Sequence, residues 1–132
     1  AGFWKQIKLS VKNLKFSLIP NSLFSEDNAA NLLRLNCDFS QEEELFYFKH
    51  SSNDTVNIFA AERLIIEWFK KIYPQKSVEI LHHTSLLIEG VLQNHSTTEE
   101  RAVFVSVEDS LMTIVVKSGF QLEFCNNFQF VT

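Results

Sequence analysis

The sequence predicts an α/β domain with a mixed sheet, flanking helices and a final three-stranded meander. Two observations lead to this prediction. Segments in which apolar and polar residues alternate, the period of a strand buried on one face, are interleaved with segments of helical period. After residue 100, every segment has the character of a strand and the connections are short. Interleaved strands and helices are typical of α/β folds, and the closing run of strands indicates a meander.

Up to residue 61 the sequence predicts four strands and one helix. Residues 7–12 (IKLSVK) and 15–20 (KFSLIP) alternate as strands, and Pro20 ends the second one. A short helix over 26–35 follows Ser25, a residue type that commonly caps a helix N-terminus. Two further strands, joined by a polar loop, are predicted at 41–50 and 53–61.

The clearest helix pattern covers residues 62–73 (ERLIIEWFKKIY) and ends at Pro74. Its apolar residues fall on one face, as in a helix that packs on a core. They are Leu64, Ile65, Trp68, Phe69 and Ile72. A strand at 77–81 and a second amphipathic helix at 82–93 follow, with Leu87, Val91 and Leu92 expected to point inward.

The segment after the second long helix, NHSTTEE, is the most polar in the chain and predicts a loop or a subdomain boundary. We expect residues 1–94 to form part of an α/β subdomain. Residues 95–132 would then open a second subdomain with strands at 101–107, 111–117 and 120–128.

Composition excludes several classes of function. A net charge of −4 with scattered Lys and Arg residues gives no footprint for nucleic acid. No apolar run approaches the ~20 residues of a membrane span, so no direct membrane insertion is expected. Cys37 and Cys125 lie far apart in apolar surroundings, which favours two reduced thiols and a cytoplasmic location.

The adjacent pair His82-His83 is the main candidate for metal ligation. Neighbouring histidines project in different directions, and no acid or cysteine at helical spacing completes a site. The sequence therefore favours one histidine near a helix start and one that is packed or solvated. A metal-dependent hydrolase that uses both histidines and a carboxylate stays an alternative. His50 and His95 are expected in exposed loops.

The acidic turn Glu108-Asp109-Ser110, between two strands, is the main candidate for ligand binding. Two adjacent acids could hold a divalent cation, but acids at the tip of a hairpin diverge, and turn preferences favour a solvated turn. Nucleophilic catalysis has no support, because neither Ser85 nor Ser110 has an evident base beside it in the sequence.

Several motifs carry a resemblance to a known family, chiefly FSLIPNSLF at 16–24 and GFQLEFCNNF at 119–128. The chain resembles an uncharacterised Bacteroidetes family of domains of unknown function. That family is similar to actin-like proteins, which have a ribonuclease H-like fold, and is nearest to the pilus-assembly and secretion scaffolds of the PilM and GspL types. The resemblance implies a central fragment of a longer protein, with the meander opening a second subdomain.

The resemblance also interprets the acidic turn. ATP-binding members of the superfamily have a glycine-containing turn at this hairpin, where backbone amides approach phosphates. Here Val107, Glu108 and Asp109 stand in its place, with no basic residue between Arg101 and Lys117. Nucleotide binding of that kind is therefore disfavoured, and no cofactor is expected.

We expect a non-enzymatic scaffold or protein-interaction domain in preference to an enzyme. A degenerate nucleotide-binding protein is the alternative from a different class. The partner would be another protein or a second copy of the chain, bound through the C-terminal strands. This expectation depends on phenylalanines that alternate only imperfectly and could leave apolar surface uncovered. They are Phe120, Phe124, Phe128 and Phe130.

Overall fold

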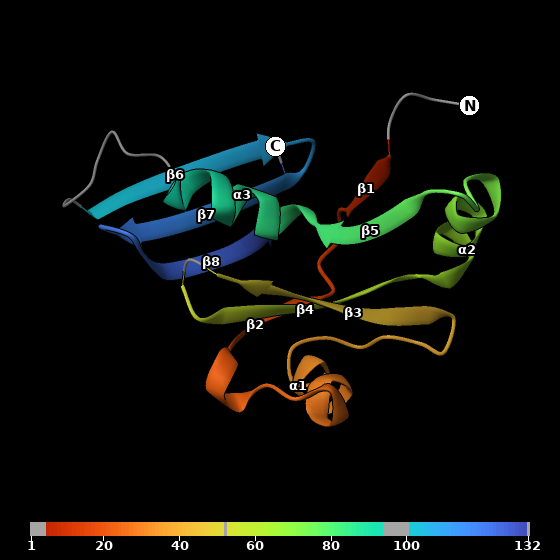
Figure 1. Cartoon of the computed structure of the whole chain (residues 1–132). Helices are drawn as coiled ribbons and strands as arrows, with labels where there is room; N and C mark the ends of the chain where they lie inside the picture. The colour runs from red at the N-terminus through yellow and green to blue at the C-terminus, as the bar shows by residue number, and fades with distance from the viewer. Residues whose placement is uncertain (1–4, 52, 94–100, 132) are drawn as a thin grey trace.

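A computed structural model of the chain describes residues 5–51, 53–93 and 101–131. Its strands and helices follow in the order expected from the sequence, and the strands form three separate sheets (Figure 1). One sheet is parallel and two are antiparallel, and the last of them is a meander. The predicted mixed α/β architecture is therefore confirmed. The predicted boundary between residues 94 and 95 lies outside the described residues.

The parallel sheet pairs β1 (Gln6–Val11) with β5 (Ser77–His82), and Leu9 lies opposite Ile80. As the alternation in β1 predicts, Leu9 and the other apolar residues of the strand face a core. That core is centred on Phe59 of the neighbouring sheet.

The second sheet has the order β2 (Phe16–Pro20), β4 (Thr55–Glu62), β3 (Glu43–His50). Its central strand, β4, is buried almost throughout because both of its faces are covered. Val56, Ile58 and Ala60 belong to one core cluster, whereas Phe59 and Ala61 belong to another.

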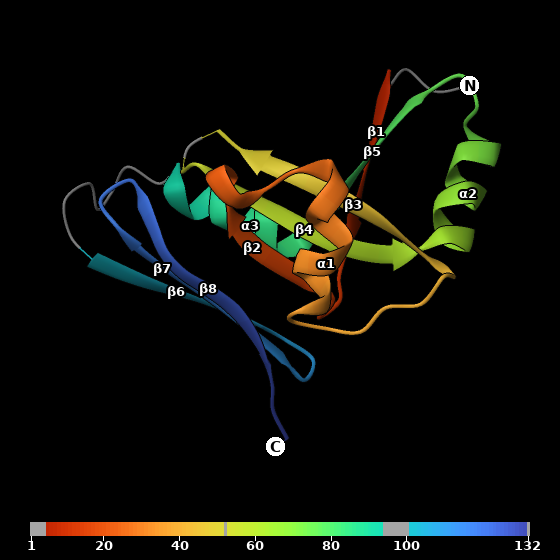
Figure 2. The same cartoon turned by 90° about the horizontal axis from the view of Figure 1, so that it is seen from below.

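Helix α1 (Ala29–Arg34) covers one face of this sheet, and β1, β5 and α3 lie toward the other (Figures 1 and 2). Two short 3-10 turns, η1 (Asn21–Leu23) and η2 (Glu26–Asn28), lead into α1. Ser25 stands at the N-cap of η2, as predicted, and its backbone N–H donates to Asn28 Oδ1 over 2.9 Å.

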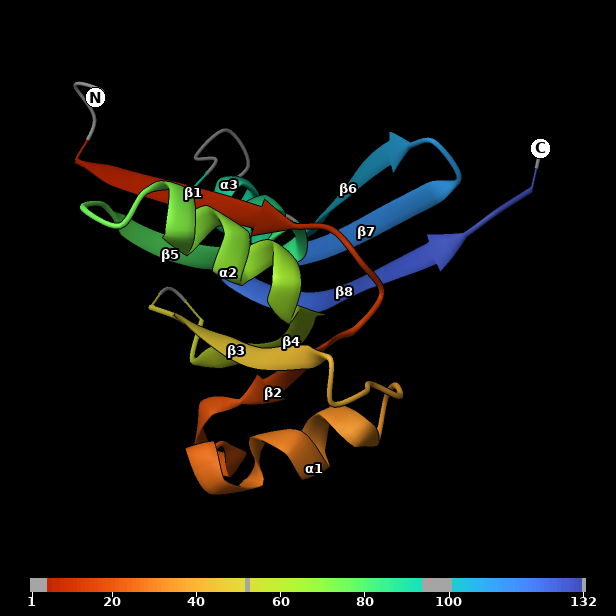
Figure 3. The ribbon, with the colours of Figure 1, turned by 90° about the vertical axis from the view of Figure 1, so that its right-hand side faces the viewer.

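Helix α2 (Arg63–Ile72) forms where the pattern predicts it, but its apolar face is mostly uncovered. Figure 3 shows α2 beside β1 and β5, and Ile66 enters their core. Ile66 is also the one buried residue of the helix. The sequence predicts only that these apolar residues share one face of the helix, and most of that face is not covered by other described residues. Exposed fractions are 78% for Leu64, 50% for Ile65, 55% for Trp68 and 46% for Ile72.

Helix α3 (His83–Leu92) lies between the β2–β4–β3 sheet and the meander and is covered on two sides. Of its apolar residues, Ile88 and Leu92 are buried, while Leu87 and Val91 pack partly against the same cluster. The inward direction predicted for Leu87, Val91 and Leu92 is thus confirmed. The burial of polar residues on the same helix, Thr84 and Ser85, was not expected.

The meander consists of β6 (Arg101–Glu108), β7 (Leu111–Ser118) and β8 (Gln121–Gln129), paired in sequence order. The register opposes Val105 to Ile114, and a bulge interrupts the second pairing after Val116. One face packs on α3 through Val115 and its neighbours (Figure 1). The three strands predicted after residue 100 are confirmed.

Candidate functional site

The acidic turn is a tight connection between β6 and β7. Asp109 adopts a left-handed backbone with φ of 53°, which Asp tolerates better than most residues. Glu108 forms an ion pair of 2.6 Å with Lys12, which follows β1. Lys12 lowers the pKa of the Glu108 carboxyl. Sequence neighbours alone offered no cation here, so the fold supplies a charge partner that the sequence did not reveal.

His82 is fully buried at the end of β5 and caps α3. Its Nδ1 accepts from the backbone N–H of Thr84 over 3.3 Å and lies 2.7 Å from Thr84 Oγ1. Its Nε2 lies 3.1 Å from the carbonyl oxygen of Asn13, to which it donates. Burial lowers the pKa of His82 to about 3, and the charge of His83 adds to this effect. A neutral imidazole with both nitrogens engaged acts as a structural cap.

His83 is partly buried and its ring lies against that of His82, with centroids 4.8 Å apart and planes tilted by 37°. Burial lowers its pKa, and neither ring nitrogen has a hydrogen-bond partner among the described residues. Ligand lone pairs lie in the ring plane, so two rings that face one another do not aim them at a common point. The described residues contain no cluster of three metal-ligating side chains.

A serine, a histidine and a glutamate that are distant in sequence meet between α3 and β3. The Ser85 Oγ lies 3.1 Å from His50 Nε2, and His50 Nδ1 lies 2.6 Å from Glu89 Oε1. This order of groups is that of a hydrolase triad. However, Ser85 is 1% exposed, and its Oγ accepts a 2.8 Å hydrogen bond from Asn57 Nδ2. A hydroxyl enclosed in this way cannot contact a substrate. The cluster instead links α3 to the β2–β4–β3 sheet.

Two expectations are corrected by this cluster. His50 is 3% exposed at the end of β3, so the prediction of an exposed loop histidine is wrong. Ser85 does have a histidine beside it, contrary to the inference from its sequence neighbours. The pairing brings together residues 35 apart in the chain, and no local pattern indicates it. His95 lies outside the described residues.

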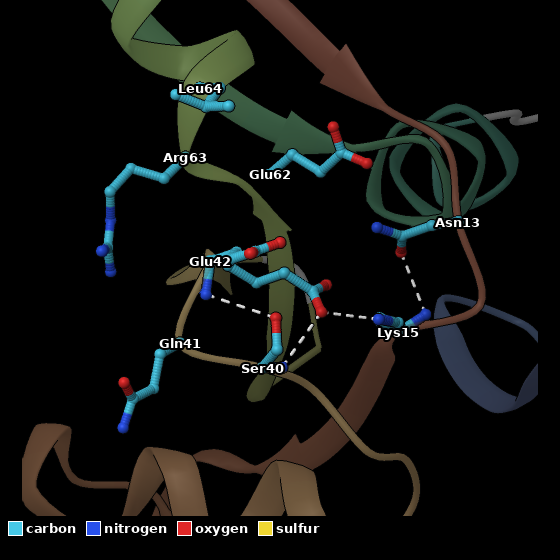
Figure 4. Close-up of a pocket in the computed structure, with 9 residues that line it drawn as sticks. Asn13, Lys15, Ser40, Gln41, Glu42, Glu62, Arg63 and Leu64 are labelled. Atoms are coloured by element: carbon cyan, nitrogen blue, oxygen red, sulfur yellow. Dashed lines mark hydrogen bonds and ion pairs between the residues drawn. The ribbon is translucent and has the colours of Figure 1, made fainter.

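A surface pocket of about 570 Å³ lies between the β1–β2 connection, the loop before β3 and the start of α2 (Figure 4). The Lys15 Nζ pairs with Glu43 Oε1 over 2.6 Å, and that oxygen also accepts from the Ser40 backbone. Burial would raise the pKa of Glu43, but these hydrogen bonds hold it below its ordinary value. Carboxylates outnumber cations among the lining residues, so the walls disfavour a phosphate. The lining residues are Asn13, Lys15, Ser40, Gln41, Glu42, Glu43, Glu62, Arg63 and Leu64.

The outer face of the meander is a continuous apolar surface. Its register aligns three cross-strand rows, and in Figure 2 no described helix lies on this side of the sheet. Phe124 and Phe128 stack along β8 with centroids 6.5 Å apart. This surface, which we call the outer meander face, contains Asn126 as its one uncharged polar side chain and no charged side chain between its rows. The rows are Val103–Val116–Phe124, Val105–Ile114–Asn126 and Val107–Met112–Phe128.

No helix among the described residues has the length and apolar character to cross a bilayer. Comparison with curated proteins gives no match. A solved structure from Bacteroides thetaiotaomicron, described as a protein with an actin-like ATPase fold and unknown function, matches with a TM-score of 0.88 and 22% identity. The match covers 98% of this chain and 49% of that one, so the chain spans about half the length of the structure that it matches.

The actin-like fold expected from the sequence resemblance is therefore confirmed. Nothing in these comparisons indicates a specific enzymatic activity. A family model described as "Protein of unknown function (DUF3822)" matches residues 1–132, and the chain belongs to that family.

Proposed function

We propose that the chain is a non-catalytic protein-interaction domain that pairs with a second copy of itself through the outer meander face. The supporting observation is the alignment of apolar side chains in three consecutive cross-strand rows. The three valines along β6 are unusually exposed for neighbouring apolar side chains. The exposed fractions are 62% for Val103, 54% for Val105 and 60% for Val107. The proposal includes a cytoplasmic location, which the two free thiols support.

The distribution of side chains favours a second copy as the occupant. Small valines line β6, and the larger Phe124 and Phe128 line β8. A two-fold axis running along β7, between two copies, lays β6 of each copy on β8 of the other. Val103 and Val107 then meet phenylalanines, and Val105 meets Asn126. Such an isologous contact is the commonest route to a dimer, and face-to-face packing of sheets is a stable arrangement.

The size of the face sets the expected strength of the contact. Strands of this length rise about 27 Å and three of them span about 14 Å, which gives a footprint of roughly 400 Å². Stable interfaces bury about 800 Å² on each partner. We therefore expect a weak dimer that dissociates on dilution through the micromolar range.

Sedimentation velocity across a range of concentrations tests this proposal. The wild-type chain should shift from monomer to dimer, and Val105→Lys should weaken association at least tenfold, because it places an ammonium in the middle of the face. Leu35→Lys is the matched control, since Leu35 is 81% exposed at the C-terminal end of α1, which covers the face of the β2–β4–β3 sheet turned away from α3 and the meander. A wild-type chain that stays monomeric at every concentration would refute the proposal, as would equal effects of the two variants.

The nucleotide-binding alternative is tested separately by thermal unfolding with Mg-ATP. The acidic turn and the pocket of Figure 4 both present carboxylates, so we expect no change in Tm. A saturable rise in Tm would contradict a purely protein-binding role, because a ligand that binds the native state alone raises its stability.

A further inference from the structure

The buried polar residues between α3 and its neighbouring strands form one continuous hydrogen-bonded network. Asn57, fully buried in β4, donates from Nδ2 to Thr84 Oγ1 over 3.0 Å and to Ser85 Oγ over 2.8 Å. The network continues from Thr84 to His82 and from Ser85 to His50. Asn57 therefore joins the histidine that caps α3 to the histidine at the end of β3.

The direction of each hydrogen bond follows from the Asn13 end of this network. His82 Nε2 lies 3.1 Å from the Asn13 carbonyl oxygen and 3.0 Å from Asn13 Oδ1, which also accepts from the Lys15 backbone. Both atoms of Asn13 are acceptors, so Nε2 carries the hydrogen of the neutral His82 ring. The Nδ1 of His82 is then an acceptor, and the Thr84 hydroxyl, 2.7 Å away, donates its one hydrogen to it.

The side-chain amide of Asn57 has only one orientation that suits this hydroxyl. Because the hydrogen of Thr84 is directed at His82, Thr84 Oγ1 must accept from Asn57. The amide carbonyl then points away from these hydroxyls, and Asn57 Oδ1 is buried without a hydrogen-bond partner among the described residues. An unpaired buried carbonyl is unfavourable, so this orientation indicates that both amide hydrogens are held by α3.

The same reasoning assigns the hydrogen on His50. Ser85 Oγ has two partners among the described residues, Asn57 and His50. It accepts from Asn57, so its own hydrogen is directed at His50 Nε2, and the ring hydrogen lies on Nδ1. That hydrogen is donated to Glu89 Oε1 over 2.6 Å. The two histidines thus have opposite tautomers, with the hydrogen on Nε2 in His82 and on Nδ1 in His50.

We propose that this network is a relay that couples Asn13 to Glu89 of α3. Asn13 lies in the wall of the pocket shown in Figure 4, so a group that displaces Asn13 within the pocket acts on His82. Without its acceptors, His82 moves its hydrogen to Nδ1 and donates to Thr84 Oγ1. Asn57 then turns over, and its carbonyl accepts from both hydroxyls.

This second arrangement changes the other end of the network. With the Ser85 hydrogen directed at the Asn57 carbonyl, Ser85 Oγ accepts from His50 Nε2. His50 then has a hydrogen on both ring nitrogens and forms an ion pair with Glu89. The added proton comes from solvent through Glu89, whose side chain is 21% exposed. The two arrangements differ in hydrogen positions and in one amide rotation, and the backbone stays in place.

Nitrogen-15 NMR of the imidazole rings tests the first arrangement, because protonated and unprotonated ring nitrogens differ strongly in chemical shift. We expect His82 in the Nε2–H form and His50 in the Nδ1–H form in the wild-type chain at neutral pH. The variants His82→Gln and His50→Gln assign the signals of the two rings. A charged ring, a mixture of tautomers or the opposite tautomer at either histidine would overturn the proposal.

Thr84→Val tests the coupling, because it removes a hydroxyl in the middle of the network and keeps the shape of the side chain. In this variant His50 Nε2 should gain a hydrogen, although three hydrogen bonds separate Thr84 from His50. Thr84→Ser restores the hydroxyl and should return the wild-type signal. Thr113→Val, the same change at a buried threonine of β7, is the matched control and should leave both histidines unchanged.

Asn13→Ala breaks the network at the pocket end and provides the test if Thr84→Val does not fold. It removes Oδ1 and should shift the His50 signal in the same direction by a smaller amount, since the backbone carbonyl of residue 13 still accepts from His82. An unchanged His50 signal in Thr84→Val, or in Asn13→Ala if Thr84→Val is unfolded, would refute the relay. These measurements do not depend on the outer meander face, because the network lies within one copy of the chain.

Discussion

Helices α2 and α3 are both ten residues long and both begin at the end of a strand, yet they differ in how they are covered. In α3, two sides contact sheets: the polar side meets His50 and Asn57, and the apolar side meets Val115. In α2, a single residue, Ile66, is buried. The sequence of α2 is the more regular amphipathic pattern of the two, so amphipathicity does not report how much of a helix is covered.

The two helices also differ at their N-termini. His82 caps α3 with its side chain, whereas Glu62 at the corresponding position of α2 makes no side-chain capping bond. Together these differences indicate that α3 is an integral part of the described fold and α2 is held at its margin. We therefore expect substitutions in α3 to lower the free energy of unfolding more than substitutions in α2, whose apolar side chains are largely exposed.

The largest expected effect comes from truncating equivalent isoleucines in the two helices. Ile88→Ala removes a fully buried side chain from the core between α3 and the meander and should lower the free energy of unfolding by about 2–5 kcal/mol. Ile65→Ala on α2 removes a half-exposed side chain and should cost about 1 kcal/mol or less. Urea denaturation of both variants measures the difference. Equal losses would mean that α2 is covered in solution.

A second effect concerns the cap of α3 and is visible as a pH dependence. The pKa of His82 is about 3 in the folded chain, below its ordinary value of 6.5, so unfolded chains take up a proton first as pH falls. Stability should therefore fall with decreasing pH between 6.5 and 3, by up to about 1.4 kcal/mol per pH unit. Above pH 6.5 this histidine contributes no pH dependence.

The comparison of wild type with His82→Gln isolates this contribution. The variant keeps an acceptor beside Thr84 but cannot titrate, so its slope should be shallower in that pH window. The carboxylates of Glu43 and Glu108 remain in both proteins and cancel in the difference. Parallel curves for the two proteins would show that His82 is not held neutral.

A third effect is expected on the polar side of α3. Ser85→Ala removes the hydroxyl that links His50 to Asn57 and leaves buried polar atoms without that partner, which should cost about 1–3 kcal/mol. Ser10→Ala, on the exposed face of β1, is the control and should be near neutral. Chemical denaturation tests both. If Ser85→Ala leaves the free energy of unfolding unchanged, then water replaces the hydroxyl and the polar side of α3 is open to solvent.

The sequence by itself determined the order and type of the secondary structure elements. Strict alternation in β1, the helical spacing in α2 and the turn-forming aspartates each depend on neighbours in the chain. Asp54, between β3 and β4, and Asp109, in the acidic turn, are the two described residues other than glycine with positive φ, both at 53°. Local preferences suffice for such features because backbone sterics and side-chain period act over a few residues.

Only the tertiary structure decided which surfaces are covered and which polar groups meet. Lys12 reaches Glu108, and His50 reaches Ser85 and Glu89, across long stretches of chain. The same is true of α2, whose apolar stripe is evident in the sequence but whose exposure depends on what packs beside it. Contacts of this kind arise when separate elements come together around a core, so no local period records them.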